Sequence, residues 1–186
     1  GPNSIETEDT YLRLDRDLAE FFSFLDETVG KGQYLVFLTA DHGGAYSLGY
    51  MKENNLPAGV WDTDLVDRLN DVLLRETGTA QLVRSDLSIA INYHINYDRD
   101  KIAQKDLDIE LIKKVSVDFL QKQPGIMYAI DLARAADAPI PGRVKEMVIN
   151  GYNRKRSGSI QIIPEPGWMP EYSQKGTTHG GWNPYD

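Results

Sequence analysis

Two short sequence strings carry the side chains that could bind a metal ion. Asp41 and His42 stand together before two glycines, and His179 stands in the string Thr-Thr-His-Gly-Gly. Carboxylate oxygen and imidazole nitrogen, without sulfur, suit zinc in a catalytic role, or manganese or iron. The neighbouring glycines would let the backbone approach such an ion closely. These three residues are therefore the candidate metal ligands.

The candidates also have ordinary structural explanations, which the sequence leaves open. Asp41 could cap backbone amides in a tight turn, and His179 taken alone would be a surface or hydrogen-bonded histidine. His94 falls on the polar side of an alternating strand pattern, so a structural role is expected for it. The basic run 154–156 is expected to be a solvated turn rather than a phosphate site.

The elements before Asp41 are expected to place it at the end of a strand. Residues 33–40 are apolar on both faces, which is typical of a central strand covered by helices. Residues 5–29 carry apolar side chains at spacings of three and four, which predicts a helix that stops at Gly30. Sites in open α/β sheets form at the carboxyl ends of strands, so Asp41 and His42 would lie at such an end. The sequence thus predicts an α/β layer fold.

Shorter elements are expected in the middle of the chain, beyond Pro57. The hydrophobic patterns predict helices at 62–76, 107–122 and 144–150, and strands at 81–85, 87–95, 126–131 and 159–163. This order predicts a compact α+β lobe inserted between two parts of a larger site.

Composition excludes several classes of protein. The chain has 186 residues, a length that suits one domain or one domain with an additional lobe. Its content of 41% hydrophobic and 26% charged residues is ordinary for a globular protein. No apolar run reaches the roughly 18 residues of a membrane span. The absence of cysteine excludes disulfides and thiolate metal sites. A net charge of −8 argues against binding of a nucleic acid duplex.

The two ends of the chain suggest a piece of a longer protein. The chain opens at Gly1 with neither an initiator methionine nor a signal-peptide pattern, and residues 182–186 provide no closing element. A targeting segment would then lie outside the chain, and its absence leaves the compartment open.

Four stretches resemble the bacterial alkaline phosphatases of the PafA type. They are GPNSIETEDTYLRLDRDLAEFF, LTADHGGA, MKENNLPAG and GTTHGGWNPYD. That type lies in the alkaline phosphatase superfamily, beside the type I phosphodiesterases and nucleotide pyrophosphatases. The resemblance covers the whole chain as the C-terminal portion of a family member, and residues 5–44 and 177–186 are its most specific parts.

The resemblance implies a fold and a division into parts. The chain would be part of an alkaline-phosphatase-like α/β/α sandwich with an inserted α+β lobe. Residues 1–60 and 164–186 would belong to the metal-binding α/β core, and residues 61–163 would form the lobe. Family members carry two zinc ions and a threonine or serine nucleophile, and they are periplasmic or secreted.

The resemblance also assigns roles to the candidate ligands. Asp41 and His42 would bind the metal that activates the nucleophile. His179 would bind the second metal, which holds the attacking water and a substrate oxygen. Two further ligands in an Asp-x-x-x-His pattern would lie just before Gly1. The nucleophile, another aspartate ligand and the residues that clamp phosphate would also lie upstream.

The resemblance therefore implies the C-terminal portion of a metal-dependent phosphate-monoester hydrolase with a small phosphate-ester substrate. This chain alone is expected to be inactive, with no metal or partial metal occupancy. A phosphodiesterase or nucleotide pyrophosphatase of the same superfamily is an alternative, and so is a non-catalytic domain that binds a partner. Apolar edges around residues 34–40 are expected to favour self-association.

Overall fold

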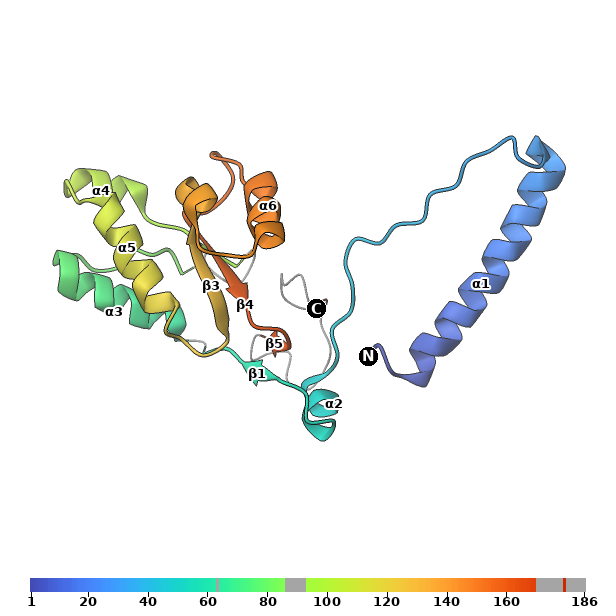
Figure 1. Ribbon diagram of the computed structural model, residues 1–186, viewed down its shortest axis with the longest axis horizontal. Coiled ribbons are helices and arrows are strands. Elements are labelled where there is room, and N and C mark those ends of the chain that lie inside the picture. Colours follow the sequence, from blue (N-terminus) through green and yellow to red (C-terminus); the bar gives the residue numbers. More distant parts are fainter. Residues whose placement is uncertain (63, 86–92, 170–178, 180–186) are drawn as a thin grey trace.

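The computed structural model describes residues 1–62, 64–85, 93–169 and 179. The first helix and the extended chain after it stand apart from the remaining elements, which gather into a compact lobe (Figure 1). Helices and strands alternate along the lobe, and its sheets are open. The α/β class that the sequence predicts is therefore confirmed.

Helix α1 (Ile5–Leu25) covers most of the predicted helical range. The Ser4 hydroxyl oxygen caps it by accepting a hydrogen bond from the N–H of Thr7 at 3.3 Å. Acidic residues in the first turn suit the positive end of the helix dipole. A short π-helical turn, η1 (Asp26–Gly30), follows, and Gly30 ends it at φ 110°, a value that favours glycine.

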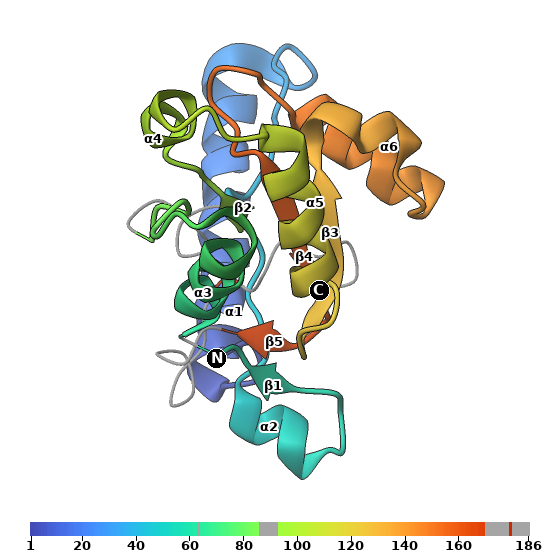
Figure 2. The same cartoon turned by 90° about the vertical axis from the view of Figure 1, so that its left-hand side faces the viewer.

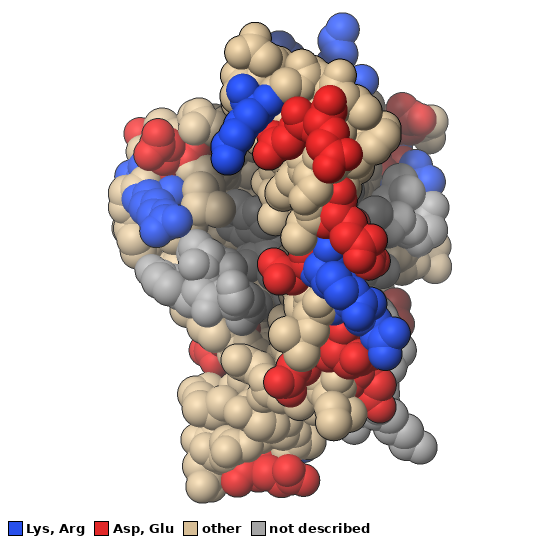
Figure 3. Space-filling model, turned by 90° about the vertical axis from the view of Figure 1, so that its right-hand side faces the viewer, with Lys and Arg blue, Asp and Glu red and all other residues tan. Residues whose placement is uncertain are grey.

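Helix α1 exposes both charged and apolar side chains. Figure 3 looks onto this helix and shows Asp and Glu side chains along it, with fewer Lys and Arg. No residue of α1 is buried. Its exposed large apolar side chains are Ile5, Tyr11, Leu12, Leu14, Phe21 and Phe24. Among the described residues, the apolar stripe that predicts the helix is thus left uncovered.

The central strand predicted at 33–40 is wrong for this chain. Residues 34–40 run as extended chain outside any strand, and the Phe37 and Leu38 side chains are each 84% exposed. Only Tyr34 is tied back, because its hydroxyl donates a hydrogen bond of 2.7 Å to a carboxylate oxygen of Asp26. A strand needs a neighbour for its backbone hydrogen bonds, and no described residue pairs with this segment.

The lobe is built on a three-stranded antiparallel sheet. Its order is β2 (His94–Ile95), β4 (Ile160–Pro164), β3 (Ile126–Asp131), so β4 is central and β3 is an edge strand. Neighbouring residues of each strand point to opposite faces of the sheet. Ala129 and Ile162 therefore lie in one hydrophobic cluster, while the residues after them, Ile130 and Ile163, lie in the other.

Helices cover both faces of this sheet. Helices α3 (Leu65–Thr77) and α5 (Ile109–Leu120) supply fully buried leucines and isoleucines to the larger cluster. Helix α6 (Gly142–Gly151) and the 3-10 helix η2 (Leu132–Asp137) cover the opposite face. Figure 2 shows α5 and α6 on the two sides of the β3 and β4 ribbons. Residues 61–163 thus contain a sheet with a core on each face.

A second, two-stranded sheet closes the lobe near its base. Strand β1 (Gly59–Val60) pairs in parallel with β5 (Trp168–Met169), more than 100 residues later in the chain. The indole ring of Trp168 lies directly against Gly59 and Gly125, where a Cβ atom would overlap it. The chain therefore enters and leaves the lobe at the same place.

The helices predicted at 62–76, 107–122 and 144–150 and the strands predicted at 126–131 and 159–163 are confirmed, most of them with shifted boundaries. Helix α3 ends at Gly78, which adopts φ 71°, and the predicted helix at 107–122 is shorter in the structure. Of the two strands predicted at 81–95, the structure shows a single bridge between Val83 and Tyr97 together with β2, and residues 86–92 lie outside the described residues. The prediction missed two short helices, α2 (Leu48–Glu53) and α4 (Arg99–Gln104). Six residues are too few to show a helical period.

A buried ion pair joins α5 to the end of β3. The Lys113 side chain is 9% exposed, and its ammonium group lies 2.6 Å from a Glu110 oxygen and 2.8 Å from an Asp131 oxygen. Burial opposes its charge, but the two carboxylates raise the pKa of Lys113 above its ordinary value.

None of the helices in the described ranges is both long enough and apolar enough to cross a membrane.

Candidate metal centre

Asp41 and His42 lie on the extended chain that joins η1 to α2, at the end of the segment predicted as a strand. Their side chains are 86% and 54% exposed, respectively. The predicted position at a strand end is therefore wrong in this chain, because the strand itself is not formed. Their exposure leaves both side chains open to a ligand.

Local hydrogen bonds fix the orientation of both side chains. One Asp41 carboxylate oxygen, Oδ1, accepts a hydrogen bond from the backbone N–H of His42 at 3.0 Å. The Nδ1 atom of His42 lies 2.7 Å from the carbonyl oxygen of Gly43. A carbonyl oxygen can only accept, so Nδ1 carries the hydrogen and Nε2 of the neutral ring has the lone pair.

The remaining atoms of the pair face each other. Nε2 of His42 lies 3.3 Å from Oδ2 of Asp41. Two lone pairs at this separation need a proton or a cation between them. Two ligands of a tetrahedral zinc ion, bound at about 2.0–2.2 Å, are themselves about 3.3–3.5 Å apart. The Asp41–His42 pair therefore fits the spacing of two ligands on one metal ion.

His179 lies beside this pair. The imidazole rings of His42 and His179 have centroids 4.9 Å apart and are tilted by 53°. In the sequence, 137 positions separate the two residues. The structure therefore brings His179 next to the Asp41–His42 pair.

The three candidates do not form a complete coordination shell in this chain. Within the described ranges, no group of three or more His, Asp or Glu side chains is arranged to hold a metal ion. The geometry thus gives a two-residue pair with a second imidazole next to it.

One neighbour of the site has no signal in the sequence. Pro2 lies beside Gly44, where a Cβ atom would be 3.5 Å from the proline Cγ. The start of the chain therefore lies next to the loop that carries the candidate ligands.

His94 has the structural role that its position in the sequence predicts. Its Nε2 lies 2.7 Å from the side-chain oxygen of Gln161, and its Nδ1 accepts a hydrogen bond from the N–H of Gly158 at 3.2 Å. Burial lowers the pKa of His94 below its ordinary value, and the hydrogen bond with Gln161 offsets only part of this effect. Both ring nitrogens are used within the lobe, so His94 is no ligand candidate.

The basic run 154–156 is also a structural turn, as predicted. The Asn153 side-chain oxygen accepts a hydrogen bond from the N–H of Lys155, and the Asn153 carbonyl accepts one from Arg156. The three basic side chains are exposed.

Comparison with known protein families places the chain in one of them. The type I phosphodiesterase / nucleotide pyrophosphatase family matches it over residues 1–186, and the chain belongs to that family.

Two of the relatives are named alkaline phosphatases. The chain is 46% identical to "Alkaline phosphatase PafA" of Elizabethkingia meningoseptica over 100% of its length and 33% of the relative's. It is 44% identical to "Alkaline phosphatase PhoV" of Synechococcus elongatus, covering 100% of the chain and 32% of that protein. It is 41% identical to a protein of Myroides odoratus named "Calcium-transporting ATPase", over 99% of the chain and 33% of that protein. The chain spans about a third of the length of these relatives.

The fold agrees with this assignment. The crystal structure of wild-type PafA matches the chain with a TM-score of 0.86 and 46% identity, over 100% of the chain and 35% of that structure. A PafA mutant matches with a TM-score of 0.85 and 44% identity, over 100% of the chain and 34% of that structure. The chain therefore has the fold of the corresponding third of an alkaline phosphatase, as the sequence resemblance implies.

Proposed function

We propose that a full-length protein containing this chain is a metal-dependent phosphate-monoester hydrolase of the alkaline phosphatase type. In this proposal the chain supplies part of the metal centre. The observation that carries it is the approach of His179 to the Asp41–His42 pair across 137 positions of sequence. The identity to PafA and PhoV supports the reaction class.

Asp41 and His42 would bind one metal ion, through Oδ2 and Nε2, and His179 would bind a second ion beside it. Zinc suits this donor set of oxygen and nitrogen atoms. When bound, two such ions clamp the attacking and leaving oxygens of an in-line displacement and offset the charge on the phosphoryl group.

The residues around the ligands have positioning roles. The Gly43 carbonyl holds Nδ1–H of His42, so the ring presents Nε2 in the form that binds a metal. The backbone N–H of His42 holds Oδ1 of Asp41 and leaves Oδ2 turned toward Nε2. Both orientations are set locally, before any ion is present.

The position of Pro2 beside Gly44 also supports the proposal. The resemblance expects two more ligands of the second metal immediately before Gly1. Pro2 lies against Gly44, so a segment that precedes Gly1 would reach the candidate centre directly. The nucleophile and the phosphate-binding residues would come from the remaining two-thirds of the protein. This chain alone would then have no turnover.

The proposed function also divides the chain into a metal-binding core and an inserted lobe. Residues 1–60 and 164–186 would belong to the metal-binding core, and residues 61–163 would form the inserted lobe. The parallel pairing of β1 with β5 supports this division, because an inserted unit must begin and end at neighbouring points. A periplasmic or secreted location would follow from the family resemblance.

The test uses the full-length protein with chromogenic phosphate monoesters and diesters. The variants Asp41→Asn and His179→Ala should each lower kcat/KM for the monoester by more than the roughly 10–100-fold loss typical of an outer-shell partner. His94→Gln is the matched control, since it removes a histidine outside the site, and it should keep activity near that of the wild type.

Three outcomes would contradict the proposal. Greater activity on the diester would favour the phosphodiesterase alternative, which the family assignment keeps open. Full activity of both ligand variants would remove the metal roles. No activity of the full-length wild type on either ester, with zinc supplied, would favour a non-catalytic domain that binds a partner.

A further inference from the structure

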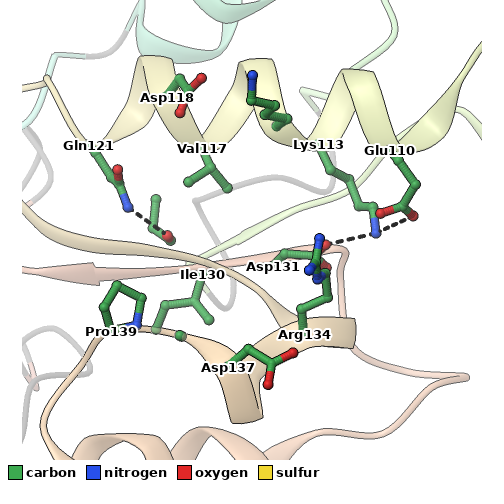
Figure 4. A pocket seen from close by; sticks show the side chains of 13 residues that line it. Glu110, Lys113, Val117, Asp118, Gln121, Ile130, Asp131, Arg134, Asp137 and Pro139 are labelled. Carbon is green, nitrogen blue, oxygen red and sulfur yellow. Dashed lines mark hydrogen bonds and ion pairs between the residues drawn. The ribbon is translucent and has the colours of Figure 1, made fainter.

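A groove in the lobe runs along the outer edge of β3, away from the candidate metal centre. It encloses about 310 Å³, near the lower end of the volumes of ligand pockets, which are about 300–1,000 Å³. Helix α5 forms one wall, and η2 with the chain after it forms the other (Figure 4). Its floor includes Ala129, Ile130 and Asp131 of β3.

The sheet register leaves backbone groups of β3 without a strand beside them. The N–H of Leu132 donates to the Ser159 carbonyl on the β4 side. In an antiparallel pair alternate residues bond to the neighbouring strand, so Ile130 also faces β4, and Ala129 and Asp131 face the groove. The edge next to the groove therefore carries the N–H and C=O groups that an added strand would use.

One of these groups is occupied by a side chain from α5. The Gln121 amide nitrogen donates to the Ala129 carbonyl at 3.4 Å, at the long limit for a hydrogen bond. This contact confirms that the Ala129 carbonyl points away from β4. It is also weak enough for the N–H of an incoming peptide to replace it.

Charged side chains along the groove favour a particular peptide. Arg134 and Asp137 lie on the wall formed by η2, Asp118 lies on the wall formed by α5, and Asp131 lies at the end of β3 (Figure 4). Within the described ranges the lining residues Lys114, Asp118, Arg134 and Asp137 have no ion-pair partner, whereas Asp131 and Glu110 are already paired with Lys113. An acidic residue would suit Arg134, and a basic residue would suit the two aspartates.

We infer that the β3 edge is a docking site for an extended peptide segment that adds as a strand, with an acidic residue near Arg134 and a basic residue between Asp118 and Asp137. Main-chain hydrogen bonds to Ala129 and Asp131 give the affinity of such a site, and the flanking charges give its selectivity. None of the candidate metal ligands lines the groove, so this inference does not depend on the proposed function.

The experiment titrates the 186-residue chain with an acetylated, amidated peptide of sequence Thr-Glu-Val-Lys-Val-Thr. Binding should slow hydrogen exchange of the Ala129 and Asp131 amides by about tenfold or more, while the Tyr128 and Ile130 amides, already in the ladder, change little. The same peptide N-methylated at the glutamate and the following valine loses donors on both of its edges. It should bind about tenfold more weakly.

Three variants separate strand addition from other kinds of binding. Ala129→Pro removes an N–H that faces the groove and leaves the β4 ladder intact, so it should weaken binding. Arg134→Glu should also weaken binding, and it serves as the test if the proline variant fails to fold. Gln121→Ala frees the Ala129 carbonyl and should strengthen binding about twofold.

The inference is overturned by any of three results. One is no binding of the peptide at millimolar concentration. Another is equal binding of the N-methylated peptide. The third is protection of the Ala129 and Asp131 amides that rises with protein concentration alone, which would make the edge a contact between two copies of the chain.

Discussion

The imidazole rings of His42 and His179 lie 4.9 Å apart, although 137 positions separate the two residues in the sequence. The whole lobe of residues 61–163 lies between them along the chain. The pairing of β1 with β5 already brings the two flanks of the lobe together, close to both histidines along the chain. Under the proposed function, a shared metal centre would hold the two glycine-flanked loops at this approach.

The chain alone should have no phosphatase turnover. Under the proposed function the nucleophile and the phosphate-binding residues lie outside residues 1–186, so addition of zinc and a chromogenic phosphate ester should give no metal-dependent hydrolysis. The measurement is release of the chromophore by the repurified chain. Turnover that survives repurification and disappears in Asp41→Ala would place a nucleophile within the chain.

The isolated chain should self-associate through its uncovered apolar segment. Leu35, Phe37 and Leu38 are 78–84% exposed, which is unfavourable for a monomer in water. Sedimentation velocity should show a species that grows with concentration. A triple change of these residues to serine should shift the population toward monomer, while Ile149→Ser, at another exposed apolar position, should not. A strictly monomeric wild-type chain at high concentration would contradict this prediction.

The stability of the lobe should fall in mild acid because of His94. Folding lowers its pKa, so the unfolded chain binds this proton more tightly than the folded chain does. The stabilisation from neutral His94 is therefore present above its ordinary pKa of 6.5 and is lost as pH falls below it. Protonation of Nδ1 also removes the acceptor for the N–H of Gly158.

Urea unfolding of the chain at about pH 8 and about pH 5 measures this effect. His94→Gln does not titrate, so its loss of stability between the two pH values should be smaller than that of the wild type. An equal loss in both proteins would assign the pH dependence to other groups.

Gly125→Ala should destabilise the lobe more than Gly78→Ala does. Both glycines have positive φ, 80° and 71°, but only at Gly125 does a Cβ atom overlap the ring of Trp168. Strain alone should cost about 1–2 kcal/mol at Gly78, and added overlap should bring the cost at Gly125 to roughly 2–4 kcal/mol. Thermal and urea unfolding of the two variants check the difference. Equal losses would show that the Trp168 contact relaxes freely.

Local patterns in the sequence predicted the lobe well. The strand at 126–131 and the helices near 62–76, 107–122 and 144–150 were predicted because each buries a periodic apolar face within the lobe itself. The small β1–β5 sheet could not be predicted, because two-residue strands carry no period and pair across more than 100 residues.

The strand predicted at 33–40 is wrong because local composition cannot supply a neighbouring strand. Its composition is that of a buried strand, yet a strand exists only when a neighbour satisfies its backbone. The types and spacing of Asp41, His42 and His179 indicated metal chemistry, while their closeness in space could come only from the family resemblance. The groove along β3 carried no sequence signal, since it arises from the register of the sheet.

The shared metal centre is tested most directly by a crystal structure of the full-length protein with anomalous data at the zinc edge. Under the proposed function, we expect one anomalous peak at about 2.0–2.2 Å from Oδ2 of Asp41 and Nε2 of His42. A second anomalous peak should lie at the same distance from a ring nitrogen of His179. An X-ray fluorescence scan of the crystal identifies the bound element. Peaks that lie away from these three side chains, or a His179 ring turned away from both ions, would contradict it.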